Sequence, residues 1–286
     1  MVENSPLKKI LECKEVPSYA GYGSRESPQI KGFEQWTVKS AQIENSPNVV
    51  RTLLYDAFQP LFDILVARRI SASERDSALR AYNILTKNSP KLLGDIYLAN
   101  FDMADFKKMV DEISEPLSNL RGVDYRRKQS NMDRDDLTMP QVFTFFRELC
   151  GQYESFGIPT PESVIGCACG ASEIAFAFSG ITELPVGFIR KSKRRDDDKV
   201  QIIEEQKQVL AKSLEGKTVL CFEDMVCSGR SLYEIMMEAK KLGASKVFGA
   251  APYKNPGDDL VRSLRVIKSE PKKYGGLNIF SLTNAD

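Results

Sequence analysis

Two adjacent acids, Glu223 and Asp224, follow an apolar segment, residues 218–222, that has the pattern of a buried strand. A short Ser/Gly loop comes next, and a helical pattern runs from Leu232 to Leu242. Carboxylates at the end of a strand can accept hydrogen bonds from sugar hydroxyls. Backbone amides in a tight loop that opens a helix can hold a phosphate, because they lack intrahelical partners and the helix dipole favours an anion. The segment therefore predicts a pocket for a ribose 5-phosphate; the alternative is an ordinary strand-to-helix turn with solvated acids.

Two earlier segments add related chemistry. Residues 163–178 indicate a strand, a tight turn at Cys169 and Gly170, and a helix of small and apolar residues, which let the main chain approach a ligand closely. Residues 184–195 indicate a strand that leads into a basic loop, whose positive charge can stabilise negative charge on a leaving group. The alternatives are a helix packed closely on a sheet and a solvated charged loop.

In their order and spacing, these three segments resemble the type I phosphoribosyltransferase family. The sequence Glu-Asp-x-Val-x-Ser-Gly-x-Ser at 223–231 is most similar to the orotate phosphoribosyltransferase branch, and the resemblance covers about residues 160–255. It implies that Glu223 and Asp224 hold the ribose 2- and 3-hydroxyls of phosphoribosyl pyrophosphate. It also implies that the loop after them holds the 5-phosphate, through Cys227, Ser228, Gly229, Arg230 and Ser231.

The resemblance assigns the two earlier segments to the pyrophosphate. The turn at Cys169 and Gly170 would present backbone amides to it. Arg190 and Lys191 match the start of the family's mobile loop, and Lys193 or Arg194 would stand for the loop lysine. The catalytic residues implied in this way are Lys191, Lys193 and Asp224.

The implied activity is a magnesium-dependent transfer of phosphoribose to a nitrogenous base, with release of pyrophosphate. Mg²⁺ would be held mainly through the oxygens of the substrate, since it favours phosphate and water ligands, and no protein metal ligands are expected. Family members are commonly dimers, so a homodimer is expected by analogy.

Several features depart from the family pattern. The chain contains no His, which also excludes Ser-His-Asp and Cys-His machinery, and residues 196–198 are three consecutive Asp in the expected mobile loop. Arg230 replaces a small residue of the phosphate loop. These departures leave open an alternative, a catalytically silent regulator or sensor of phosphoribosyl pyrophosphate or nucleotides. A third possibility is a different ribosyl chemistry on the same scaffold, such as nucleotide hydrolysis.

Composition sets wider limits. With 286 residues, 42% of them hydrophobic, the chain can bury a substantial core, and a net charge of +1 gives no general attraction to nucleic acid or anionic membranes. It has no apolar run of about 18 residues that could span a membrane and no apolar N-terminal segment typical of a secretory signal. Six Cys without Cys-x-x-Cys spacing favour reduced core residues and a cytoplasmic location. A nucleic acid or protein partner for the N-terminal region is conceivable, but no basic stripe supports it.

The pattern changes near residue 155. Beyond it, short apolar runs alternate with helical patterns, which predicts an α/β domain at 156–286, a parallel sheet flanked by helices. The expected strands are 163–167, 185–190, 218–223 and 246–252, with one more at 278–282. Ligands of such sheets bind at the carboxyl ends of the strands, where Glu223 and Asp224 would lie.

Residues 1–155 are predicted to be mainly helical. An irregular arm at 1–48 is expected to pack through its aromatic residues, Tyr19, Tyr22, Phe33 and Trp36. A helix at 49–69 should be broken or kinked at Pro60, and a capping box at 71–74 should start a helix that runs through Leu85. Further helices are expected at 102–114 and 139–155, with an exposed connector at 124–136.

Overall fold

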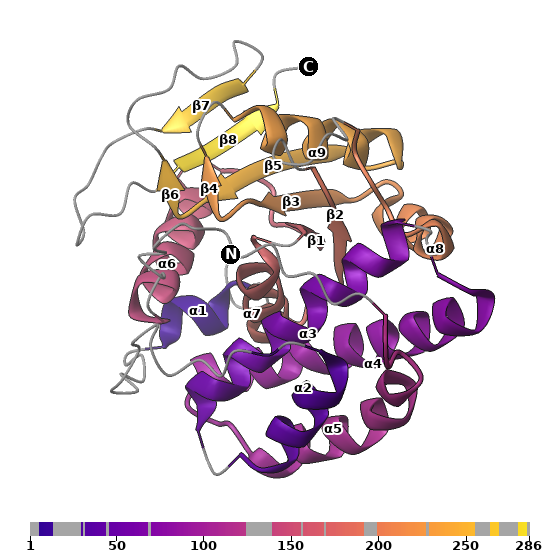
Figure 1. The fold of residues 1–286 in the computed structure, drawn as a ribbon. Coiled ribbons are helices and arrows are strands. Elements are labelled where there is room, and N and C mark those ends of the chain that lie inside the picture. Colours follow the sequence, from indigo (N-terminus) through magenta and orange to yellow (C-terminus); the bar gives the residue numbers. More distant parts are fainter. Residues whose placement is uncertain are drawn as a thin grey trace.

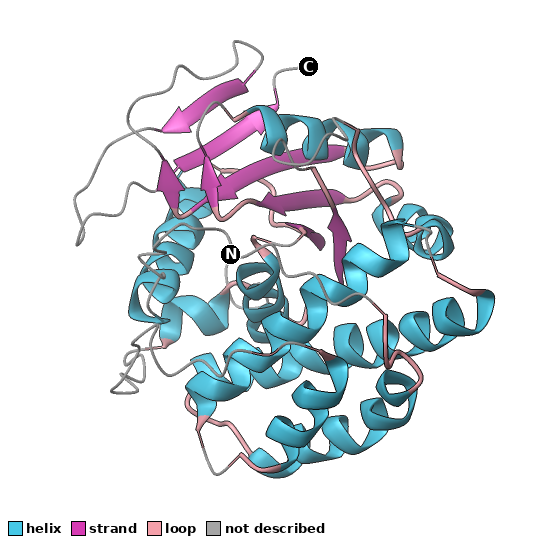
Figure 2. Cartoon of the chain, in the orientation of Figure 1, coloured by secondary structure: helices cyan, strands magenta, loops and turns pink. Residues whose placement is uncertain are grey.

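The computed structural model describes most of the chain, in ranges separated by gaps. They are 6–13, 30, 32–43, 46–67, 70–123, 139–155, 157–168, 170–191, 199–226, 229–254, 264–268 and 280–284. Helices precede the sheet, as the sequence predicts (Figures 1 and 2). They are α1 (Lys8–Glu12), α2 (Phe33–Ala41), α3 (Pro47–Ala67), α4 (Ala72–Tyr97), α5 (Met103–Ser118) and α6 (Met139–Ser155).

The second half forms a mixed sheet with a parallel centre. Its strands are β1 (Ser163–Cys167), β2 (Val186–Ile189), β3 (Thr218–Phe222), β5 (Lys246–Ala251), β7 (Leu264–Lys268) and β8 (Phe280–Asn284). They lie in the order β2-β1-β3-β5-β8-β7; the first four are parallel to one another, and β8 is antiparallel to both of its neighbours. Two short strands, β4 (Met225–Val226) and β6 (Tyr253–Lys254), pair separately. The predicted α/β architecture is thus confirmed.

Helices cover both faces of the sheet. The remaining helices are α7 (Ser172–Thr182), α8 (Glu204–Leu214) and α9 (Arg230–Lys241). On one face, the Phe222 ring of β3 lies 5.2 Å from the Phe178 ring of α7. On the other face, α9 packs so closely on β5 that a Cβ at Gly249 would lie 2.8 Å from the Met236 sulfur. Figure 1 shows α7 and α9 on opposite sides of the sheet.

The helical first half and the sheet share one hydrophobic core. Phe58 of α3 lies 5.3 Å from the Phe176 ring of α7 and 4.5 Å from the Phe188 ring of β2. Helices α4 and α7 cross at two glycines, where a Cβ on Gly180 would lie 1.8 Å from the Pro90 carbonyl oxygen. The boundary predicted near residue 155 therefore separates a helical part from an α/β part, and the two parts pack against each other. The division into domains 1–155 and 156–286 stays a prediction.

Most element boundaries in the first half agree with the sequence patterns. Helix α6 spans the predicted range, and the capping box is formed: the Ser71 hydroxyl accepts from the Glu74 amide, and Glu74 accepts from the Ser71 amide at 2.7 Å. The prediction of an irregular arm at 1–48 is wrong where the structure describes it, because α1 and α2 are helical. The predicted packing of Trp36 is confirmed, since its side chain is buried and its Nε1 donates to the Leu53 carbonyl at 2.8 Å.

The predicted break at Pro60 and the predicted helix end near Leu85 are both wrong, whereas a kink at Pro60 stays a prediction. Helix α3 continues through Pro60, and α4 runs past Pro90 to Tyr97 instead of ending near Leu85. In both helices the buried face continues beyond the proline, for example at Leu61 in α3. Burial of these side chains offsets the hydrogen bond that proline removes. Tyr19, Tyr22 and the connector at 124–136 lie outside the described residues.

Candidate functional site

The site is formed where three parallel strands end. Strand β1 pairs with β2 on one side, with Cys167 opposite Ile189, and with β3 on the other, with Gly166 opposite Phe222. Because the strands are parallel and in this register, the residues that follow them meet at one edge of the sheet. The predicted turn, basic segment and acid pair all follow these strands.

The turn after β1 contacts the acid pair after β3. A Cβ placed on Gly170 would lie 2.5 Å from Oδ2 of Asp224, so only a glycine leaves room for this carboxylate. The Cys167 thiol, at the end of β1, hydrogen-bonds to Glu223. The structure thus brings together two motifs that are distant in the sequence, the turn at Gly170 and the acid pair Glu223 and Asp224.

Glu223 has an unusual electrostatic environment. Burial raises the pKa of its carboxyl well above the ordinary value, and the charge of Asp224 raises it further, while the hydrogen bond from Cys167 acts in the opposite direction. Burial likewise raises the pKa of the Cys167 thiol, which keeps it a neutral donor. Oε2 of Glu223 is buried and has no hydrogen-bond partner among the described residues. A ligand hydroxyl or a cation would satisfy this oxygen, since a buried acceptor without a donor is costly.

Lys191 lies at the same edge, after β2, and is paired with an acid. Its Nζ is 2.7 Å from Oε2 of Glu234 on α9, and its side chain is only 1% exposed. Oε1 of Glu234 accepts from Nε of Arg230, also at 2.7 Å. Burial raises the pKa of Glu234, but the hydrogen bonds from Lys191 and Arg230 outweigh this and leave the pKa below its ordinary value. Glu234 is therefore an ionised carboxylate between two cations that were expected to meet phosphates.

Arg190 points to a different partner. Its guanidinium forms an ion pair with Asp63 of α3, with side-chain exposures of 6% and 12%. Its backbone also forms an antiparallel bridge with Gln201. The predicted role of Arg190 in ligand binding stays a prediction. Its ion pair with Asp63 connects the end of β2 to the helical first half.

The predicted phosphate loop is described only from Gly229 onward. Gly229 has φ 75°, in the left-handed region that glycine adopts without strain, and it caps the start of α9. Arg230 and Ser231 form the first turn of α9, whose amides lack intrahelical acceptors. The other members predicted for the site, Cys169, Lys193, Arg194, Cys227 and Ser228, lie outside the described residues.

Sequence reasoning missed three residues that contact the site or its supports: Glu234, Asp63 and Glu173. The pairing of Arg230 with Glu234 could have been found, because the two residues are four positions apart on a predicted helix. The pairs Lys191–Glu234 and Arg190–Asp63 join distant segments, so no local pattern indicates them.

The residues described contain no cluster of three or more His, Cys, Asp or Glu side chains placed to bind a metal ion. The same part of the chain has no helix that combines the length and apolar character required to cross a bilayer.

The chain is similar to known proteins in its second half. Residues 155–270 match the family model of the phosphoribosyl transferase domain. The purine phosphoribosyltransferase of Pyrococcus horikoshii is 25% identical over 44% of this chain and 80% of its own, with a TM-score of 0.34. A hypoxanthine phosphoribosyltransferase of Staphylococcus aureus is 18% identical over 52% and 90%, with a TM-score of 0.33. Comparison with curated proteins gave no match. The family match confirms, over residues 155–270, the predicted resemblance to the type I phosphoribosyltransferases.

Proposed function

We propose that this protein binds phosphoribosyl pyrophosphate and transfers its phosphoribosyl group to a nitrogenous base. The observation that carries the proposal is the meeting of Gly170, Lys191, Glu223 and Asp224 at one sheet edge, within the segment that matches the phosphoribosyl transferase domain. A nitrogen lone pair of the base would form the new bond to the anomeric carbon. The bond from that carbon to the pyrophosphate oxygen would break, and its electron pair would leave with pyrophosphate.

The residues at this sheet edge would divide the binding of the substrate among them. Glu223 and Asp224 would accept hydrogen bonds from the ribose hydroxyls, for which Oε2 of Glu223 is available. Lys191 would offset the negative charge that develops on pyrophosphate, and the start of α9 at Gly229–Ser231 would bind the 5-phosphate. The turn at Cys169 and Gly170 would present its amides to the pyrophosphate.

Magnesium is compatible with this site. Two adjacent carboxylates are oxygen donors of the kind that Mg²⁺ accepts, and Asp224 is partly exposed. When bound with the substrate, the ion would supply additional charge stabilisation for the leaving pyrophosphate. The ion would be held mainly through the oxygens of the substrate. We further propose that the protein is a homodimer in the cytoplasm.

The test is a turnover assay that detects pyrophosphate release from phosphoribosyl pyrophosphate with a panel of purine and pyrimidine bases. Asp224→Asn should abolish turnover, because the amide cannot accept from both ribose hydroxyls in the same way. Turnover retained in Asp224→Asn, or no ligand binding by the wild-type protein in calorimetry, would refute the proposal.

A silent sensor is the second candidate, and one observation favours it. Lys191 and Arg190, both expected to meet pyrophosphate, are paired with carboxylates of the chain itself. A sensor would bind phosphoribosyl pyrophosphate without releasing pyrophosphate for any base in the panel.

A further inference from the structure

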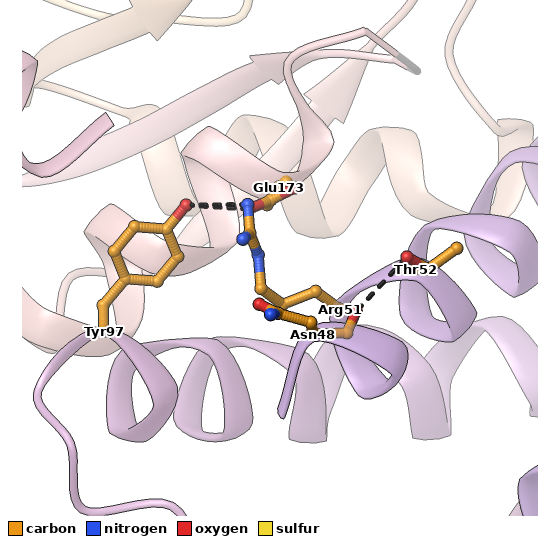
Figure 3. A network of polar contacts seen from close by, with 5 residues as sticks. All are labelled: Asn48, Arg51, Thr52, Tyr97 and Glu173. Atoms are coloured by element: carbon orange, nitrogen blue, oxygen red, sulfur yellow. Dashed lines mark hydrogen bonds and ion pairs between the residues drawn. The ribbon is translucent and has the colours of Figure 1, made fainter. Parts of the chain in front are cut away.

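Helix α3 makes a buried polar contact with the start of α7. The Arg51 side chain is 1% exposed, and its Nε donates to Oε1 of Glu173 at 2.7 Å. The Tyr97 hydroxyl, from the end of α4, donates to the same oxygen at 2.7 Å. Figure 3 shows Arg51 and Tyr97 converging on Glu173 from separate helices. Two donors from the helical first half thus fix one side chain in the first turn of α7.

Glu173 is close to the turn that contacts the acid pair. It follows Gly170 by three residues, and Gly170 lies directly against the Asp224 carboxylate. The Ala171 amide donates to the Cys167 carbonyl and the Ala171 carbonyl accepts from Ala175, which join the turn to both β1 and α7. A shift of the first turn of α7 would therefore move Gly170 relative to Asp224.

Helix α3 also makes a second ion pair, with the end of β2. Asp63 of α3 pairs with Arg190, and Lys191 is the next residue. The Arg190 amide and carbonyl are both bonded to Gln201, at 2.9 Å each, so the Asp63 pair adds a side-chain restraint to an ordered backbone. One helix of the first half is thus connected to both elements that flank the predicted pyrophosphate position.

We propose that Arg51 and Asp63 are positioning residues for pyrophosphate. Through Glu173 and Arg190 they hold the turn at Gly170 and the strand end at Lys191 in the relative orientation that the pyrophosphate group requires. The inference rests on the proposed function and goes beyond it, because it assigns the helical first half a part in ligand selection. Neither residue contacts the ligand. Both act through a direct partner on the elements that would bind pyrophosphate, whereas the start of α9, which would bind the 5-phosphate, is reached indirectly, through Lys191 and Glu234.

The test compares two ligands on the full-length protein by calorimetry: inorganic pyrophosphate with Mg²⁺, and ribose 5-phosphate. The variants are Asp63→Asn and the double variant Arg51→Gln with Glu173→Gln, which avoids leaving the Glu173 carboxylate without its cationic partner. Because small misplacements of binding groups have large effects, pyrophosphate affinity should fall about tenfold or more in each. Ribose 5-phosphate affinity should fall by about twofold or less, since α3 is connected to the start of α9 indirectly, through Arg190, Lys191 and Glu234.

The matched control is Glu205→Gln, which removes the ion pair with Arg75 and leaves the hydrogen bond from Arg75 to the Leu65 carbonyl of α3. Arg75 of α4 also links the two halves, through an ion pair with Glu205 of α8 at 2.5 Å, but α8 is not part of the site. This variant should lower the melting temperature, because it removes a structural link. It should leave the ratio of the pyrophosphate and ribose 5-phosphate affinities unchanged.

The outcomes separate the two proposals. A wild-type protein that binds neither ligand refutes the proposed function, and the inference with it. A wild-type protein that binds both, together with a ratio unchanged in Asp63→Asn or in the double variant, refutes the positioning role alone. A changed affinity ratio in both variants, together with an unchanged ratio in Glu205→Gln, supports the positioning role.

Discussion

Glu234→Gln should strengthen pyrophosphate binding while it weakens the fold. Glu234 lies between Lys191 and Arg230, at 2.7 Å from each, and is 23% exposed. If pyrophosphate is to meet Lys191, it must displace this carboxylate or tolerate its negative charge. Replacing the carboxylate by an amide of the same shape removes the charge and keeps a hydrogen-bond acceptor.

The magnitude follows from the Lys191–Glu234 distance. At 2.7 Å and an effective dielectric constant of about 20, the Coulomb energy of the pair is about 6 kcal/mol before desolvation. The net value of a charged hydrogen bond is about 1.5–3 kcal/mol, and a neutral amide retains about 1 kcal/mol of it. The substitution thus costs about 0.5–2 kcal/mol of folding free energy, which corresponds to a melting temperature lower by about 1–8 °C. Since pyrophosphate no longer competes with that energy, its affinity should rise about 2- to 30-fold.

Calorimetry with pyrophosphate and Mg²⁺, together with thermal unfolding in the absence of ligand, measures both effects. The matched control is Glu238→Gln on the same helix; Glu238 is 20% exposed and pairs at 3.0 Å with Lys241, which is not part of the site. The control should leave pyrophosphate affinity unchanged. If affinity falls in Glu234→Gln, the carboxylate orients Lys191 for the ligand and does not compete with it, and the reasoning is refuted.

Three further substitutions test the site and its support. Gly170→Ala should lower phosphoribosyl pyrophosphate affinity at least tenfold in calorimetry, because its Cβ would lie 2.5 Å from the Asp224 carboxylate; unchanged affinity would contradict the contact. Gly180→Ala should lower the free energy of unfolding by about 3 kcal/mol in urea titration, since the α4 backbone must move away; a loss below about 1 kcal/mol would show that the crossing is looser. The raised pKa of Glu223 means that the folded state keeps a proton that the unfolded state loses, so the contribution of Glu223 to stability falls as pH rises above the ordinary value of 4.5. Glu223→Gln cannot ionise, so its melting temperature relative to wild type should increase between about pH 5 and about pH 8, and a constant difference would exclude the raised pKa.

Local patterns predicted the parallel strands and the acid pair well. Residues 163–167 and 218–222 are short apolar runs that are buried on both faces, and such runs are specified by the residues within them. The meeting of Gly170 with Asp224 could be expected from topology alone, because neighbouring parallel strands end at the same edge. Contacts of this kind depend on strand order, which the local patterns do not give and the structure supplies.

Ion pairs between distant elements could not be predicted in this way. Asp63 lies 127 positions from Arg190, and Glu234 lies 43 positions from Lys191, so their pairing depends on how whole helices pack on the sheet. The predicted break at Pro60 and the predicted helix end near Leu85 are wrong for a related reason. Proline lowers local helix propensity, but the buried face that outweighs it is defined by tertiary contacts.

The charge balance of the site bears on the choice between enzyme and sensor. Lys191 and Arg190 are neutralised by carboxylates that belong to α9 and α3, so the described site has no excess of positive charge before a ligand binds. A multiply charged anion must then replace these carboxylates at the cations, or bring its own counterion. Mg²⁺ bound to the pyrophosphate would reduce the anion's charge and lower the cost of placing it beside these carboxylates. Strong magnesium dependence of binding is therefore expected for either function, and only release of pyrophosphate with a base distinguishes the transferase from the sensor.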